Sequence, residues 1–96
     1  DVAAAAKAWK AAEEMIANTE YSMIILDEIN IALRYDYLSL SEVLRGLAQR
    51  PHMLHIVATG RNAKEEMIEA ADLVTEMTLV KHPFRNGIKA QKGVEF

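Results

Sequence analysis

The sequence predicts an α/β fold, a layered and mostly parallel sheet flanked by helices. Two short apolar runs of strand length, residues 21–26 and 55–58, alternate with longer stretches that have helical periodicity. Strands that alternate with helices are joined by crossovers and therefore run parallel in one sheet. A third run, residues 73–80, predicts one more strand. The chain has 96 residues, 51% of them hydrophobic, which is sufficient for the core of one small domain or part of one.

The first helix is predicted over residues 2–17. Its apolar side chains recur at steps of three and four residues, with lysines and glutamates between them. This apolar stripe consists of Val2, Ala5, Trp9, Ala12 and Ile16. We expect it to face the core. The next run, residues 21–26, is almost continuously apolar, which is typical of a strand that is buried on both faces.

Two pairs of residues predict where later helices begin. Ser39 and Glu42 have the spacing of a capping box, so a helix is expected to follow Ser39 and to end before Pro51. Asn62 and Glu65 have the same spacing and predict a further helix that reaches about residue 70. Residues 55–58 are expected to form a second buried strand between these two helices.

The first candidate site is Asp27-Glu28, which follows four apolar residues and so has the form of a Walker B strand. Ligands of open α/β sheets bind at the carboxyl ends of the strands, and carboxylate oxygens suit Mg²⁺. The alternative is that the two acids only mark the point where a buried strand reaches solvent.

The second candidate site is the turn Thr59-Gly60-Arg61, which follows the next strand and precedes a helix. Backbone N–H groups, the positive end of that helix and the Arg61 guanidinium would favour an anion such as phosphate. An ordinary capped turn with a solvent-facing arginine is the alternative. Since both candidate sites follow neighbouring parallel strands, we expect them to share one edge of the sheet.

Several kinds of site are absent from the sequence. None of the four glycines belongs to a phosphate loop of the form G-x-x-x-x-G-K-[ST], and no G-x-S-x-G elbow is present. The chain has no cysteine, which fits a reducing cytoplasm, and its three histidines lack the spacing of zinc ligands. No apolar run is long enough to cross a membrane.

The charge of the chain is divided unevenly. The net charge is -3, with 7 basic and 13 acidic residues in 1–80 but 4 basic and 1 acidic in 81–96. The basic end could meet phosphates or simply face solvent. Nucleic-acid binding is not expected, because no basic stripe is interleaved with aromatic side chains. Tyr35 and Tyr37 remain open as stacking groups for a flat ligand, whereas Trp9 is expected in the core.

Seven segments, in order along nearly the whole chain, resemble the ATP:corrinoid adenosyltransferase family of cobalamin synthesis and salvage, which acts on cob(I)alamin or cob(I)yrinic acid a,c-diamide. They are ILDEIN at 25–30, LRYDYL at 33–38, RP at 50–51, TGR at 59–61, ADLVTEM at 71–77, VKHPF at 80–84 and GIKAQKGVEF at 87–96.

The resemblance implies a P-loop protein of the RecA-like type, usually a homodimer, in which residues 1–96 form the carboxy-terminal part of one domain. The phosphate loop and first strands would then precede this chain. Such an enzyme uses Mg²⁺ and transfers the 5′-deoxyadenosyl group of ATP to the cobalt of a reduced corrinoid, releasing triphosphate. Cobalt is the nucleophile, so no catalytic residue of the protein is expected. A reductase partner would keep the corrinoid reduced.

The resemblance also assigns roles to residues of this sequence. Glu28 is the expected Mg²⁺ ligand, with Asp27 beside it as a ligand or support. Arg61, with Thr59 and Gly60, is an expected nucleotide contact. Lys89 and Gln91 in the basic end are expected to contact the nucleotide as well.

Two alternatives remain. The chain could be a fragment of a P-loop ATPase or kinase, in which the same two sites serve phosphoryl transfer. It could also be a non-catalytic assembly module whose acids and basic tail form a partner surface. If the chain is part of an adenosyltransferase, the missing phosphate loop predicts that it binds ATP poorly and is inactive alone, and exposed sheet edges are expected to favour self-association.

Overall fold

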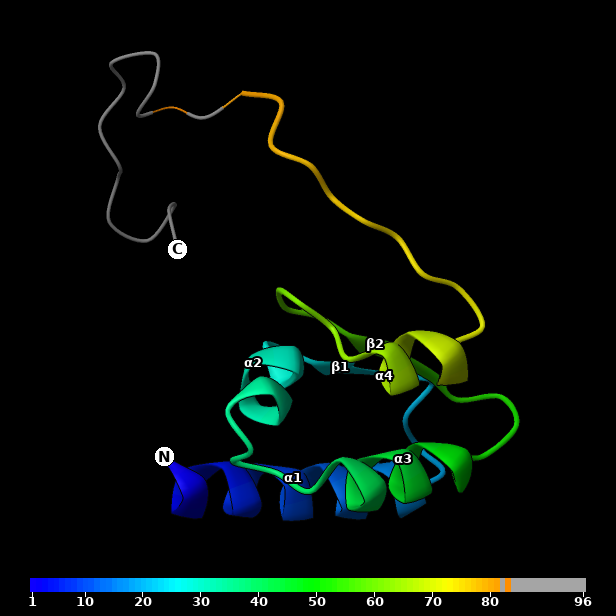
Figure 1. Ribbon diagram of the computed structural model, residues 1–96. Helices are drawn as coiled ribbons and strands as arrows, with labels where there is room; N and C mark the ends of the chain where they lie inside the picture. Colours follow the sequence, from blue (N-terminus) through cyan, green and yellow to red (C-terminus); the bar gives the residue numbers. More distant parts are fainter. Residues whose placement is uncertain (82, 84–96) are drawn as a thin grey trace.

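The computed structural model describes residues 1–81 and 83, which form a small α/β unit (Figure 1). Its elements are α1 (Val2–Ala17), β1 (Met23–Leu26), α2 (Ile29–Arg34), α3 (Leu40–Ala48), β2 (His55–Ala58) and α4 (Glu65–Ala70). The predicted fold class, helices flanking a parallel sheet, is therefore confirmed. The bounds predicted for α1 and β2 are also confirmed.

The sheet consists of β1 and β2, which pair in parallel. Met23 lies opposite His55 and Leu26 opposite Ala58, so the two strands end level with each other. A parallel pair needs a long crossover, and here α2 and α3 lie in the chain between the two strands. The level ends bring the residues that follow each strand side by side.

One face of the sheet is buried against helices. α1 contacts both β1 and α3, and Figure 1 shows α1 and α3 side by side beneath the strands. The core consists of Trp9, Ala12, Ile16, Ile24, Leu26, Ile29, Leu33, Val43, Leu54 and Met67. Trp9, Ala12 and Ile16 bear out the predicted stripe of α1, whereas Val2 is exposed.

α1 and α3 approach closely because α3 has a glycine at the contact. A Cβ built on Gly46 would lie 2.6 Å from the Trp9 ring. Glycine in a helix interior costs about 1 kcal/mol relative to alanine. The space that Gly46 leaves for the indole offsets this cost, because an alanine there would displace the largest side chain of the core.

The other face of the sheet is exposed among the described residues. Met23, Ile25 and Val57 lie on this face, and Ile25 has 61% of its surface exposed. Within residues 1–81 and 83, the expectation that the first strand is buried on both faces was wrong, and so was the expectation that the second strand is buried. The apolar sequence of β1 is that of a two-sided strand, but the described part of the chain supplies helices for one side only.

The predicted helix starts were right for α3 and wrong for α4. Ser39 caps α3, and its hydroxyl accepts a hydrogen bond from the Glu42 N–H at 3.4 Å. Asn62 does not cap α4, because it adopts a left-handed conformation with φ 55° and the cap is Lys64. α2, directly after Glu28, was not predicted.

The predicted third strand was also wrong. Residues 73–80 follow α4 as extended chain without strand pairing, and Figure 1 shows this segment, coloured yellow to orange, running away from the sheet and helices. Met77 and Val80 are each 93% exposed. The alternating pattern is that of a strand, but a strand also needs a partner for its backbone groups, and neither β1 nor β2 pairs with it.

Candidate functional site

The acidic pair and the glycine turn meet at one edge of the sheet. Asp27 and Glu28 follow β1 directly, and Thr59 and Gly60 follow β2. The register places Leu26 beside Ala58, and the Thr59 N–H extends the ladder by donating to the Leu26 carbonyl at 3.2 Å. The predicted shared edge is therefore confirmed.

Thr59 is the residue that joins the two strand ends. Its hydroxyl accepts a hydrogen bond from the Glu28 N–H at 3.0 Å and donates one to Asp27 Oδ1 at 3.2 Å. Its carbonyl accepts a hydrogen bond from the Asn30 N–H at 3.2 Å. A hydroxyl can donate and accept at once, so one threonine fixes the backbone of Glu28 and the carboxylate of Asp27 together.

Glu28 has an unusual backbone conformation. Its φ is 62°, in the left-handed region that residues with a side chain seldom adopt. This conformation turns the chain abruptly from β1 into α2. Glu28 is the N-cap residue of α2, but its side chain makes no capping hydrogen bond. The hydrogen bond from the Glu28 N–H to Thr59 holds this turn. The Glu28 side chain remains exposed.

Gly60 and Asn30 pack closely against each other. Asn30 Nδ2 donates to the Gly60 carbonyl at 3.0 Å. A Cβ on Gly60 would lie 3.0 Å from the Asn30 Cβ, and the Gly60 φ of 126° is itself unfavourable for other residues. Asn30 was not identified from the sequence as a site residue, because its role depends on a contact across 30 positions of the chain.

The contacts among Asp27, Glu28, Asn30, Thr59 and Gly60 form one junction at the carboxyl ends of the two strands. Arg61 lies exposed beside this junction and forms no ion pair with any described residue. The N-terminus of α4 favours an anion at this turn less than the sequence predicted. α4 begins only at Glu65, has six residues, and carries Glu65 and Glu66 in its first turn. Since these acids repel an anion, the case for phosphate at this turn rests on the Arg61 guanidinium and the nearby backbone.

The oxygen donors at the junction fit a hard cation such as Mg²⁺. They are the exposed carboxylates of Asp27 and Glu28 and the Thr59 hydroxyl. Asp27 Oδ2 accepts no hydrogen bond from a described residue, so that oxygen remains for a ligand. Among the described residues, no three His, Cys, Asp or Glu side chains lie together in a way that could hold a metal ion. Two carboxylates suit Mg²⁺, which keeps several waters and shares its coordination with substrate phosphates.

The remaining candidate residues lie elsewhere. Lys89 and Gln91 lie outside the described residues. Tyr35 and Tyr37 follow α2 with ring centroids 5.9 Å apart, and both rings are at least partly exposed. Among the described residues, no hydrogen bond or ion pair joins the Tyr35 or Tyr37 side chain to the junction.

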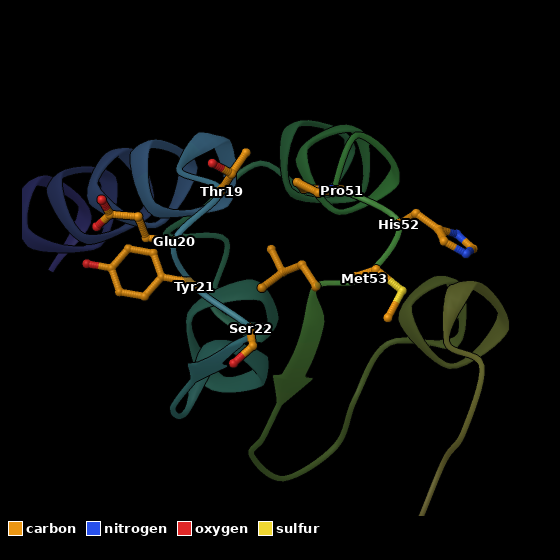
Figure 2. A pocket seen from close by; sticks show the side chains of 8 residues that line it. Thr19, Glu20, Tyr21, Ser22, Pro51, His52 and Met53 are labelled. Carbon is orange, nitrogen blue, oxygen red and sulfur yellow. The ribbon is translucent and has the colours of Figure 1, made fainter.

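The opposite edge of the sheet holds an open hollow of about 390 Å³. Figure 2 shows Thr19–Ser22 before β1 on one side and Pro51, His52 and Met53 before β2 on the other. Unlike the carboxyl edge, the residues that line this hollow include only one carboxylate, that of Glu20, and none of them has a positive φ. None of the helices within the described residues is long and apolar enough to span a bilayer.

Comparisons with known proteins identify the family of the chain. The family model of the ATP:corrinoid adenosyltransferases BtuR/CobO/CobP matches residues 1–96. Proteins named corrinoid adenosyltransferase are 66% identical in Sinorhizobium sp, 56% in Pseudomonas aeruginosa and 41% in Escherichia coli K12. Each match covers 100% of this chain but only 45%, 47% and 49% of the relative. The chain thus spans about half the length of these relatives, and it belongs to the ATP:corrinoid adenosyltransferase family.

Proposed function

We propose that the protein containing this chain transfers the 5′-deoxyadenosyl group of ATP to the cobalt of a reduced corrinoid in cobalamin metabolism. In this reaction a cobalt–C5′ bond forms, the bond between C5′ and the triphosphate oxygen breaks, and triphosphate leaves. The observation that carries the proposal is the junction at the carboxyl edge, where Thr59 links Asp27 and Glu28 to the Gly60-Arg61 turn. Membership of the adenosyltransferase family supports the same reading.

Because the corrinoid cobalt is the nucleophile, the protein needs only to bind and orient ATP and the corrinoid. Asp27 and Glu28 would hold Mg²⁺, which when bound offsets the negative charge of the triphosphate. Arg61 would pair with phosphate oxygens on the same side, and Thr59 would keep the two groups at a fixed spacing. Holding C5′ of ATP in line with the corrinoid is then the main source of rate acceleration.

The rest of the site is proposed to come from parts of the protein beyond the described junction. The chain has no phosphate-loop sequence and spans about half of its relatives. We therefore infer that residues 1–96 are the carboxy-terminal part of one P-loop domain and are inactive alone. Lys89 and Gln91 would add nucleotide contacts. The protein is also proposed to be a cytoplasmic homodimer supplied by a reductase.

Product analysis of the complete gene product tests the proposal. The protein is incubated with ATP, Mg²⁺ and a chemically reduced corrinoid, and the products are separated by chromatography. Adenosylated corrinoid and triphosphate in equal amounts are expected. ADP and phosphate without adenosylated corrinoid would instead identify a P-loop ATPase or kinase. Full adenosylation by a folded Glu28→Gln variant would show that the acidic pair serves another purpose, such as assembly.

A further inference from the structure

Asn30 is the one polar side chain in the core of the described residues, with 6% of its surface exposed. It lies in the first turn of α2, two residues after Glu28. Its backbone N–H donates to the Thr59 carbonyl and its side chain donates to the Gly60 carbonyl. A single residue beside the acidic pair thus holds two successive carbonyls of the turn that leads to Arg61.

The Asn30 amide is only half satisfied. Nδ2 has its partner in Gly60, but the buried Oδ1 accepts no hydrogen bond from any described residue. A buried acceptor without a partner costs at least as much free energy as one neutral hydrogen bond contributes. The amide is therefore poorly explained as a source of stability. What it provides is a fixed position for the Gly60 carbonyl.

The contact leaves the turn little freedom to move. Gly60 approaches the Asn30 Cβ and backbone so closely that any other residue would push the two segments apart. Thr59, the preceding residue, reaches Asp27 with its hydroxyl, and Arg61 follows directly. A shift of the Gly60 carbonyl would therefore change the spacing between Arg61 and the acidic pair.

We propose that Asn30 is a positioning residue for the nucleotide site. It acts through the Gly60 carbonyl to hold Arg61 at a fixed distance from Asp27 and Glu28, so that one triphosphate can meet the cation and the guanidinium together. This inference rests on the proposed function, since it assumes that Mg²⁺ and ATP bind at this edge of the sheet. Asn30 itself need not touch the nucleotide.

A double-mutant cycle tests this role. The affinity of the complete gene product for ATP with Mg²⁺ is measured by calorimetry for the parent protein, Asn30→Ala, Arg61→Ala and the double variant. Asn30→Ala is expected to weaken binding about tenfold when Arg61 is present and less than about twofold when Arg61 is absent. The KM for the reduced corrinoid should not change. A merely structural residue would weaken binding equally in both backgrounds.

The outcomes separate this inference from the proposed function. Equal losses in both backgrounds, or no loss, would overturn the role of Asn30 while Arg61→Ala still weakened binding as the function requires. An Arg61→Ala variant with unchanged affinity would overturn the role of Arg61 and with it the role of Asn30, whereas the product analysis alone decides the proposed reaction. If Asn30→Ala does not fold, Asn30→Leu keeps nearly the size and shape of the side chain, removes the donor without adding a charge, and enters the same cycle. Failure of both variants to fold would make Asn30 a stability residue and overturn the inference.

Discussion

The two edges of the sheet differ in how the loops beyond them are tied together. At the carboxyl edge, two backbone hydrogen bonds and three that involve a side chain connect residues 26–30 to Thr59 and Gly60. At the amino edge, the described loops share one backbone hydrogen bond, from His55 to Ser22, beside an open hollow. The pairing of two strands requires only backbone hydrogen bonds of the kind found at the amino edge. The additional polar contacts at the carboxyl edge therefore fix the acidic pair and the glycine turn relative to each other.

The largest expected difference between the edges concerns their glutamates. In the complete gene product, Glu28→Gln should lower adenosyl transfer by at least about 100-fold, because the carboxylate proposed to bind the cation is lost. Glu20→Gln, at the amino edge, is the matched control and should retain activity within about twofold. Initial rates of adenosylated-corrinoid formation measure both. Equal losses in the two variants would remove the distinction between the edges.

The two glycines of the described residues provide a second comparison. Gly46→Ala and Gly60→Ala should each lower the free energy of unfolding by about 1–3 kcal/mol, the first by displacing Trp9 and the second by crowding Asn30. Urea unfolding measures this. Only Gly60→Ala should also weaken the binding of ATP with Mg²⁺. A similar loss of affinity in Gly46→Ala would mean that general destabilisation, not the carboxyl edge, controls binding.

The Thr59 hydroxyl allows a smaller and more local test. Thr59→Val keeps the shape of the side chain but removes the hydrogen bonds to Glu28 and Asp27, at about 0.5–1.5 kcal/mol for each bond. A several-fold weaker affinity for ATP with Mg²⁺ should accompany this loss of stability. Thr59→Ser restores the hydroxyl and should recover the affinity. If Ser and Val behave alike, the hydroxyl does not hold the acidic pair.

The smallest effect is expected in the hollow at the amino edge. Met53 has 75% of its surface exposed there, so Met53→Ala should change the free energy of unfolding by less than about 0.5 kcal/mol. Nucleotide affinity should stay unchanged. A clear loss of affinity in this variant would show that the hollow takes part in binding.

Much of this arrangement could be predicted from sequence because it depends on local pattern. The stripe of Trp9, Ala12 and Ile16 predicts α1, and the apolar run before Asp27 predicts β1. Parallel pairing then brings the acidic pair beside Thr59. These features follow from periodicity and from the rules of crossover connections, which need no knowledge of distant contacts.

The errors arise where distant contacts decide the structure. Residues 73–80 have a strand pattern, but pairing depends on a sheet edge that a local pattern does not contain. Asn62 has the right spacing for a cap, yet its left-handed backbone leaves the start of α4 to Lys64. Asn30 is buried where the distant Gly60 packs closely against it. A polar residue between the apolar Ile29 and Ile31, next to the acidic pair, was the one available signal for it.

The carboxyl edge of the sheet is proposed to hold both the cation and the triphosphate. The most direct measurement is a crystal structure of the complete gene product with ATP and Mn²⁺ in place of Mg²⁺, with the cation located by anomalous scattering. We predict a single strong peak that Glu28 or Asp27 binds directly or through one water, with the triphosphate lying between it and Arg61. A peak and nucleotide at the amino-edge hollow, or at any place away from the acidic pair, would contradict the account.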